Sequence, residues 1–169
     1  MIGYSEVIQT MAAMIIFSII LLNANSMMHR NTTMQITGEL EQQVISIGQE
    51  IIEEARTKAF DRVTYQTSMP PTSIPGGFTP TSEFPNEKER TDFIAFEDYH
   101  EYTETVSTTH GEFTIDVEVF YVDDTNFEPT VLQSTFKKIE VTIRSTFLTD
   151  AADEPRSYKL EFLRNYYAD

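Results

Sequence analysis

The carboxylates and histidines are the residues of this 169-residue chain whose chemistry could serve a site, because it contains no cysteine. Without Cys there is no thiolate nucleophile, no Cys-ligated metal and no disulfide framework. His29, His100 and His110 lie far apart and lack the i, i+4 spacing to another ligand that helical metal sites use. We expect all three to face solvent. With no Gly-rich phosphate loop and no nucleophile elbow, we expect no catalytic residues and no enzyme.

A short acidic cluster offers the best oxygen ligands for a metal ion. Asp123, Asp124, Asn126 and Glu128 follow a predicted strand and could bind Ca²⁺. Their spacing departs from the EF-hand loop, which needs Asp or Asn at its first, third and fifth positions, Gly at its sixth and Glu at its twelfth. We therefore favour a solvated turn, with calcium as the alternative and no other cofactor.

Two further acidic groups could in principle supply an acid and base pair. These are the neighbours Glu53 and Glu54 and the run from Asp98 to Glu104. We expect the first to be a wet helix face and the second a wet loop.

The distribution of charge excludes several partners. Lys and Arg number 12 against 27 Asp and Glu, giving a formal net charge of −15, so binding to nucleic-acid phosphates is not expected. The first 30 residues contain only Glu6 and Arg30, which cancel, so the rest of the chain carries the whole net charge. With 40% apolar residues, the chain as a whole can bury a core.

The uncharged stretch between Glu6 and Arg30 is a candidate membrane helix. The 22 residues from Val7 to Met28 reach the roughly 20 that cross a hydrocarbon core. A cleaved secretory signal is the rival interpretation, but no Lys or Arg precedes the apolar run. We therefore favour a retained anchor. Its apolar centre consists of Met11, Met14, Ile15, Ile16, Phe17, Ile19, Ile20, Leu21 and Leu22.

Helical periodicity continues beyond this stretch. Leu40, Val44, Ile47, Ile51 and Ala55 recur at steps of three and four, which places them on one face of a helix. Because no proline occurs before residue 70, we expect one helix from about residue 5 to about residue 60. A break near residues 23–25 is the alternative, since Asn is a weak helix former.

The second half of the chain changes character twice. Proline, glycine, serine and threonine dominate residues 65–109, which predicts an irregular loop with short strands possible at 93–96 and 104–107. Beyond Gly111 the period becomes two, predicting antiparallel strands around 113–121, 139–147 and 158–162. Their apolar face needs a cover, and the stripe from Leu40 to Ala55 can supply it. The predicted fold is α+β, with a long N-terminal helix packed distally against a C-terminal antiparallel sheet.

This arrangement resembles the type IV pilin and pseudopilin superfamily. The specific motif is Ser5-Glu6-Val7-Ile8 and the apolar run that follows it, while the strands FKKIEVTIRSTF and YKLEFLRNY look like the closing strands of pseudopilins. The resemblance implies four regions: a filament-core helix at 1–30, its amphipathic continuation at 31–60, a variable loop region at 61–112 and a sheet at 113–169.

The resemblance also implies residues for assembly. In that family a peptidase cuts after a Gly, and a Glu at the fifth mature position precedes the apolar run. If Glu6 is that Glu, Ile2 is the first mature residue and Met1 stands where the Gly should be; if the cut follows Gly3, Glu6 becomes the third mature residue. The family's usual proline within the apolar helix is absent here.

Three functions are compatible with these patterns. The first is a structural subunit of an extracellular pilus-like filament, whose partners are copies of itself and the pilus assembly machinery, with a precursor in the inner membrane. The second is a minor pseudopilin of a type II secretion-like system. The third is a membrane-anchored protein that displays its sheet for binding.

Overall fold

The computed structural model describes residues 3–66, 73–85, 89–109, 111–149 and 155–168. The chain divides into two compact units, Met1–Glu41 and Gln42–Asp169. One helix, α1 (Tyr4–Thr57), supplies the described part of the first unit apart from Gly3 and continues into the second.

Helix α1 is continuous through residues 23–25, where a break was the alternative expectation. Residues 23–25 are helical, as are Gly38 and Gly48, so one uninterrupted helix of 54 residues forms. The prediction of a single helix from about residue 5 to about residue 60 is confirmed. Without proline, every residue after the first turn can donate its N–H to the carbonyl four residues earlier.

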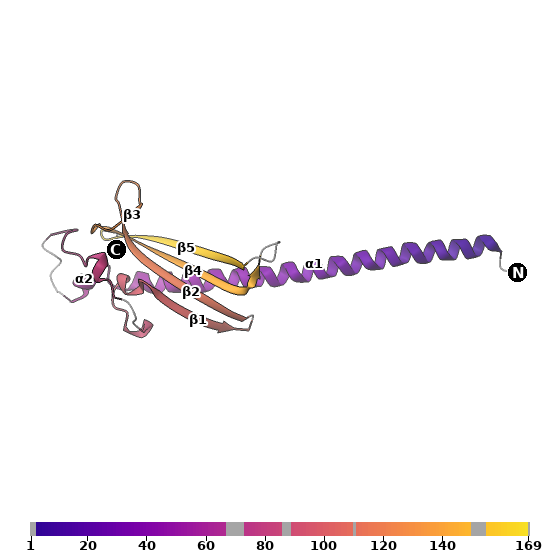
Figure 1. The fold of residues 1–169 in the computed structure, drawn as a ribbon, viewed down its shortest axis with the longest axis horizontal. Coiled ribbons are helices and arrows are strands. Elements are labelled where there is room, and N and C mark those ends of the chain that lie inside the picture. The colour runs from indigo at the N-terminus through magenta and orange to yellow at the C-terminus, as the bar shows by residue number, and fades with distance from the viewer. Residues whose placement is uncertain (1–2, 67–72, 86–88, 110, 150–154, 169) are drawn as a thin grey trace. The chain divides into compact units, whose positions relative to one another are not determined.

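The sheet belongs to the second unit. Within the described ranges, five strands form one antiparallel sheet: β1 (Tyr102–Thr108), β2 (Gly111–Val122), β3 (Pro129–Thr130), β4 (Phe136–Thr149) and β5 (Pro155–Asn165). The order is β1-β2-β4-β5, and the short β3 pairs with β2 (Figure 1). The three strands expected from alternation are β2, β4 and β5, and the short strand expected at 104–107 lies within β1.

The part of α1 that belongs to the second unit runs along one face of the sheet (Figure 1). On the helix, Val44, Ile51 and Ala55 are at most 1% exposed. A Cβ placed on Gly48 would lie 3.0 Å from Leu160 Cδ1 and 3.2 Å from Ile143 Cδ1, so this glycine marks a close approach of the helix to β5 and β4. The sheet buries every second residue on its apolar face, as predicted: Phe113, Ile115, Val117, Val119, Tyr121, Ile139, Val141 and Ile143.

The alternation in β4 changes near its end. The period of two places Phe147 on the apolar face with Ile143, but its side chain is 59% exposed and Leu148 is buried instead. The cause is a register shift between Arg144 and Thr149, which turns the following residues over. Phe147 lies over Gly111, whose φ of +122° and lack of a Cβ permit this contact.

The segment between α1 and β1 is well packed rather than slack. It contains α2 (Arg62–Gln66) and the short 3₁₀ turns η1 (Thr81–Glu83), η2 (Arg90–Asp92) and η3 (Phe96–Tyr99). The strand expected at 93–96 is wrong: only one bridge, between Ala59 and Ala95, forms there. The Asp98 carboxylate accepts the N–H groups of Ile94 and Ala95, and this favours the 3₁₀ turn over an extended strand. Six aromatic side chains from this segment are buried: Phe60, Phe78, Phe84, Phe93, Phe96 and Tyr99.

Candidate functional site

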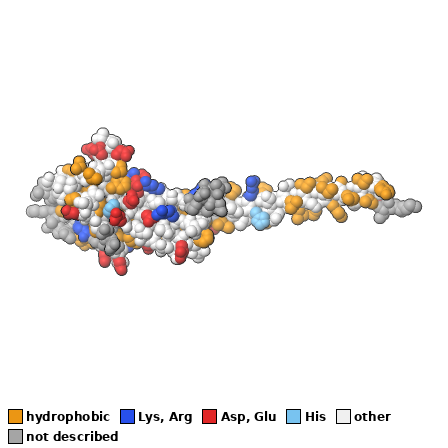
Figure 2. Space-filling model, in the orientation of Figure 1, with side chains coloured by type: hydrophobic (Ala, Val, Ile, Leu, Met, Phe, Trp, Pro, Cys, Tyr) orange, Lys and Arg blue, Asp and Glu red, His pale blue; other side chains and the backbone are white. Residues whose placement is uncertain are grey.

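The apolar first half of α1 is the candidate site with the clearest chemistry. Its most apolar 18-residue window has a mean hydropathy of 2.1 and no residue buried, and its length and composition suffice to cross a membrane. Nine large apolar side chains of the predicted filament-core set are 52 to 71% exposed: Met11, Met14, Ile15, Ile16, Phe17, Ile19, Ile20, Leu21 and Leu22. Figure 2 shows these side chains along the helix, while acidic side chains gather over the unit that holds the sheet.

The exposed apolar residues occupy every face of the helix. From Met14 to Leu22, Ser18 is the one polar residue in nine consecutive positions, which is more than two helical turns. A helix that lies flat on a membrane surface keeps one polar face, whereas a helix that is apolar all round is surrounded by hydrocarbon or by other helices. This segment has the second pattern.

Two hydroxyl side chains in the first half of α1, those of Thr10 and Ser18, are satisfied by the helix itself. The Thr10 hydroxyl donates to the carbonyl oxygens of Glu6 and Val7, at 2.7 and 2.9 Å as alternatives for its one proton, and the Ser18 hydroxyl donates to the carbonyl oxygen of Met14 at 2.8 Å. A hydroxyl bonded in this way can enter an apolar environment without an unpaired donor.

Glu6 lies in the first turn of α1. Its Oε2 accepts the N–H of Gly3 at 3.3 Å, which caps one of the free donors at the helix N-terminus. The negative charge also suits the positive end of the helix dipole. The sequence placed Glu6 in an assembly motif, and the cap is an additional role. Ile2 and Met1, the other predicted assembly residues, lie outside the described residues.

The acidic cluster forms an exposed turn between β2 and β3. Asp123 Oδ1 accepts the N–H of Thr125 at 2.8 Å, and Asn126 Oδ1 accepts the N–H of Glu128 at 3.1 Å. Asp124 accepts the Thr125 hydroxyl at 3.1 Å. These oxygens hold the turn together, as in Asx turns. Among the described residues, no group of three His, Asp or Glu side chains is placed to hold a metal ion, and calcium at this turn stays the alternative to the predicted solvated turn.

The histidines do not share one environment. His29 is exposed on α1, as expected. His100 is partly buried: its Nδ1 accepts the N–H of Val119 at 3.3 Å, and its ring lies edge-on to Phe84. The expectation that it faces solvent is therefore wrong. His110 lies outside the described residues.

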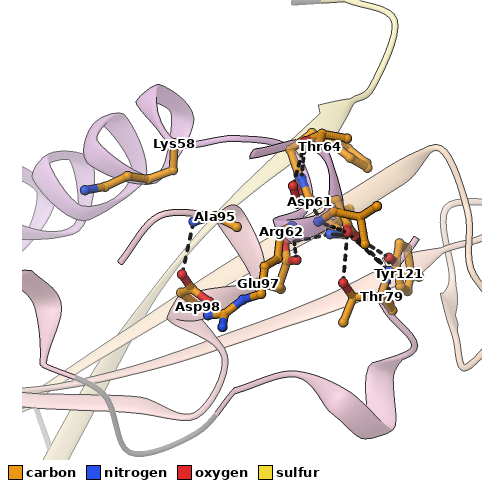
Figure 3. A network of polar contacts seen from close by, with 12 residues as sticks. Lys58, Asp61, Arg62, Thr64, Thr79, Ala95, Glu97, Asp98 and Tyr121 are labelled. Carbon is orange, nitrogen blue, oxygen red and sulfur yellow. Dashed lines mark hydrogen bonds and ion pairs between the residues drawn. The ribbon is translucent and has the colours of Figure 1, made fainter. Parts of the chain in front are cut away.

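The largest departure from the sequence analysis is a buried cluster of charged side chains (Figure 3). Lys137 of β4 donates from Nζ to Asp61 Oδ2 at 2.7 Å, to Glu97 Oε2 at 2.8 Å and to the carbonyl oxygen of Phe60 at 2.9 Å. The side chains of Lys137, Asp61 and Glu97 are all 0% exposed. A buried ammonium with three acceptors has no unpaired donor.

The carboxylates of this cluster have opposite pKa shifts. Burial raises the pKa of Asp61, but the charge and hydrogen bond of Lys137 with the donors Thr79 and Val63 outweigh it and lower the pKa below its usual value. For Glu97, burial is again the largest cause, and the nearby Asp61 charge adds to it, so its pKa is raised despite Lys137. Asp61 is therefore the carboxylate that stays ionised, and Glu97 is the one that binds a proton more readily.

Two acidic groups that were expected to be wet are partly buried. Asp98 forms an ion pair with Arg62, and its side chain is 0% exposed. Glu54 forms an ion pair at 2.6 Å with Arg90, which also contacts Glu50 at 2.9 Å and Glu104 at 3.3 Å. Arg90 thereby ties α1 to β1. Glu53 remains on the exposed helix face, as predicted.

A signal for part of the buried cluster was present in the sequence. Lys137 precedes Ile139, Val141 and Ile143 by even steps, so the strand period places its side chain on the apolar face. Asp61 and Glu97 had no such pattern, because they lie in irregular segments.

Comparisons with family models, with curated proteins and with solved structures found no match to this chain. Its class therefore comes from the structure: an α+β protein with a long N-terminal helix, apolar in its first half, and an antiparallel sheet packed on the second half in a pilin-like arrangement.

Proposed function

We propose that this chain is a structural subunit of an extracellular, type IV pilus-like helical filament that polymerises through the apolar half of α1. Its partners are further copies of itself and the pilus assembly machinery. Before assembly the same helix anchors the subunit in the inner membrane. The observation that carries the proposal is the apolar surface that surrounds α1 from Met14 to Leu22.

An all-round apolar helix suits two environments in succession. In a membrane its neighbours are lipid tails, and in a filament its neighbours are equivalent helices of other subunits. The change of neighbour leaves every apolar face covered, so the helix needs no polar face at either stage. The acidic second unit remains in water at both stages.

Glu6 supports the same proposal through its charge. Within the described residues its carboxylate accepts one N–H hydrogen bond and has no ion pair with a Lys or Arg. An ionised group near hydrocarbon is costly unless it is paired. The N-terminal amine of a neighbouring subunit is a cation that every subunit in a polymer can supply.

Electron microscopy of cell-surface material tests the proposal. Material sheared from cells that make this protein is imaged by negative staining, and the fibres are purified and identified by mass spectrometry. We expect long fibres that contain this chain. The chain confined to the membrane fraction, with no fibres in sheared material, would instead indicate an anchored binding protein.

A pair of matched variants links the fibres to the helix. Ile16→Asp introduces a charge at the middle of the apolar segment, at a cost of about 2.5 to 3.5 kcal/mol in a membrane. Leu132→Asp changes a residue of similar exposure in the second unit, 71% against 59%. We expect the first variant to abolish fibres and the second to retain them. Equal fibre yields from both would contradict assembly through α1.

A further inference from the structure

The buried cluster of Lys137, Asp61 and Glu97 brings an amine and two carboxyl groups together away from water. Lys137 Nζ is 2.7 Å from Asp61 Oδ2 and 2.8 Å from Glu97 Oε2. Lys137 is on β4, Asp61 follows α1 and Glu97 is in η3, so three segments that are distant in sequence converge on one point. A surface ion pair would leave its charged groups in contact with water, whereas these three side chains are fully buried.

Aromatic rings complete the enclosure. Lys137 Nζ lies 4.8 Å from the centroid of the Phe60 ring, 5.4 Å from that of Phe84 and 5.0 Å from that of Tyr121. A wall of this kind keeps bulk water away from Lys137 and Asp61, so an amide formed between them would be protected from hydrolysis.

We propose that Lys137 and Asp61 join in an intramolecular amide bond between Nζ and Cγ, with Glu97 carrying protons during the reaction. The proposal does not depend on filament formation. It assigns this cluster as a site of self-catalysed covalent modification that braces the second unit.

The reaction balances without an added reagent. The Lys137 ammonium gives one proton to Asp61 Oδ2, which leaves a neutral amine and a carboxylic acid. The nitrogen lone pair forms the N–C bond to Asp61 Cγ, and Glu97 takes a second proton from nitrogen and returns it to Oδ2. The C–Oδ2 bond then breaks and one water molecule leaves. No oxidant, reductant or metal takes part.

The two oxygens of Asp61 have environments suited to different roles. Oδ1 accepts hydrogen bonds from the Val63 N–H at 3.1 Å and the Thr79 hydroxyl at 2.9 Å, and the Thr79 N–H is shared between Oδ1 and Oδ2 at 3.2 Å from each. These donors would stabilise the negative charge that develops on Oδ1 when nitrogen adds to the carbon. Oδ2 faces Lys137, and the Tyr121 hydroxyl is 3.0 Å from it, so it is the oxygen placed to leave as water.

Glu97 is suited to carry the proton. Its Oε2 contacts the reacting nitrogen, while Oε1 is held by the N–H of Arg62 at 2.5 Å. Its raised pKa, caused first by burial, means that it takes up a proton more readily than an exposed glutamate. Holding the reacting groups in contact can be worth an effective concentration of about 10⁵ to 10⁸ M.

The amide bond would supply a covalent cross-link of the kind that disulfides supply in other proteins. There is no Cys in the sequence, so no disulfide can link distant segments. An amide between Asp61 and Lys137 spans 76 residues of sequence and ties the segment after α1 to β4.

Mass spectrometry of the purified full chain in detergent tests the proposal. We expect an intact mass lower by one water molecule than the sequence mass, after the N-terminal peptide has shown where the chain begins. Trypsin should release a branched peptide in which residues 59–62 are joined to residues 91–138, because the modified Lys137 resists cleavage. An intact mass equal to that calculated from the sequence, with peptide 59–62 released free, would overturn the proposal. An intact mass lower by one water molecule, with peptide 59–62 still unbranched, would also overturn it.

Neighbouring lysines provide the matched control. Lys138 lies beside Lys137 but faces the other side of β4, where it pairs with Glu140 and Glu161. We expect Lys137→Met to abolish the branched peptide and Lys138→Met to retain it. Glu97→Gln should reduce the branched fraction at least tenfold when the chain is digested soon after synthesis. An unchanged fraction would overturn the role of Glu97, and the wild-type peptide map decides the bond itself even if a variant fails to fold.

Discussion

Glu6 combines a negative charge with a hydrogen-bond acceptor, and substitution can separate these two properties. As an acceptor it caps the N–H of Gly3. As a charge it would, in the proposed filament, pair with the N-terminal amine of another subunit. Glutamine retains an acceptor of similar reach without the charge, whereas alanine loses both.

We expect Glu6→Gln and Glu6→Ala both to reduce filament yield sharply while the second unit stays folded by circular dichroism. Removing one member of a buried ion pair costs about 3 to 5 kcal/mol. The loss of a cap costs about 1 kcal/mol, and only alanine loses it. Filament yield and length by electron microscopy measure the effect. Normal assembly of the Gln variant with failure of the Ala variant would assign Glu6 to capping, and normal assembly of both would leave it a boundary charge.

The ion pairs of Arg90 predict a dependence of stability on acid. Partial burial raises the pKa of Glu54, but the hydrogen bond and charge of Arg90 and the charge of Lys58 outweigh it, so the pKa lies below its usual value of 4.5. A carboxylate with a lowered pKa in the folded state stabilises the fold above the unfolded-state pKa. That contribution is lost as the pH falls from 4.5 through the lower folded-state pKa.

We expect Arg90→Ala to lower the free energy of unfolding by about 1 kcal/mol near neutral pH, a modest value because the partners are partly exposed. The difference between variant and wild type should shrink below pH 4.5, when Glu54 becomes protonated in both. Urea unfolding at a series of pH values measures it. The control is Arg56→Ala, which removes an exposed i, i+3 pair with Glu53. A difference that stays constant down to pH 3 would contradict the assignment to Glu54.

Single residues were predictable where a period constrained them. The alternation of β4 places Lys137 on the apolar face, so its burial could be deduced, although its partners could not. Asp61, Glu97 and Asp98 lie in irregular segments where neither helical nor strand period applies, and their burial depends on contacts distant in sequence. The run after Asp98 was expected to be wet because it is acidic, but Arg62 and two backbone N–H groups satisfy that carboxylate inside the protein.

At the scale of elements, Gly48 sets the distance between α1 and the sheet. It lies in the helix where Leu160 and Ile143 come closest. A larger side chain there must displace two packed side chains of β5 and β4. Gly38 lies in the same helix with no heavy atom within 4 Å of an added Cβ.

We expect Gly48→Leu to lower the free energy of unfolding by about 1 to 3 kcal/mol through overpacking. The matched Gly38→Leu variant should be neutral or more stable by up to about 1 kcal/mol, because leucine favours a helix more than glycine does. Chemical unfolding followed by circular dichroism measures both. Equal effects at the two positions would show that helix propensity, and not the approach to the sheet, determines the result.

Elements with a sustained period were predicted well, and the others were not. The 3.6-residue stripe and the strands β2, β4 and β5 follow from regular spacing of apolar residues. The 3₁₀ turn at Phe96–Tyr99 does not follow from such spacing. Aromatic residues such as Phe93 and Phe96 favour strands locally. The Asp98 carboxylate overrides that preference because it accepts the N–H groups of Ile94 and Ala95. The register shift in β4 likewise follows from no period, and it turns Phe147 outward over Gly111.

At the scale of the whole molecule, the chain separates its apolar exposed surface from its charge. The first 30 residues are neutral overall, and the remainder carries −15. In the second unit the apolar residues of β2 and β4 are largely buried, whereas in the first unit the apolar residues from Met11 to Leu22 are exposed. The second unit therefore buries most apolar side chains of β2 and β4 in a core, whereas the first unit leaves its apolar side chains on the surface.

We predict that a chain beginning at Asn31 is a soluble monomer and that the full chain polymerises or requires detergent. Covering the apolar helix among its copies removes several hundred Å² of apolar surface from water, and roughly 400 Å² at about 25 cal/mol per Å² corresponds to about 10 kcal/mol per subunit. The shortened chain keeps Leu40, Val44, Ile51 and Ala55, so the helical cover of the sheet remains. Size-exclusion chromatography with light scattering, with and without detergent, measures the mass of each chain. A full-length chain that stays monomeric in water without detergent would rule out both the filament and the membrane anchor.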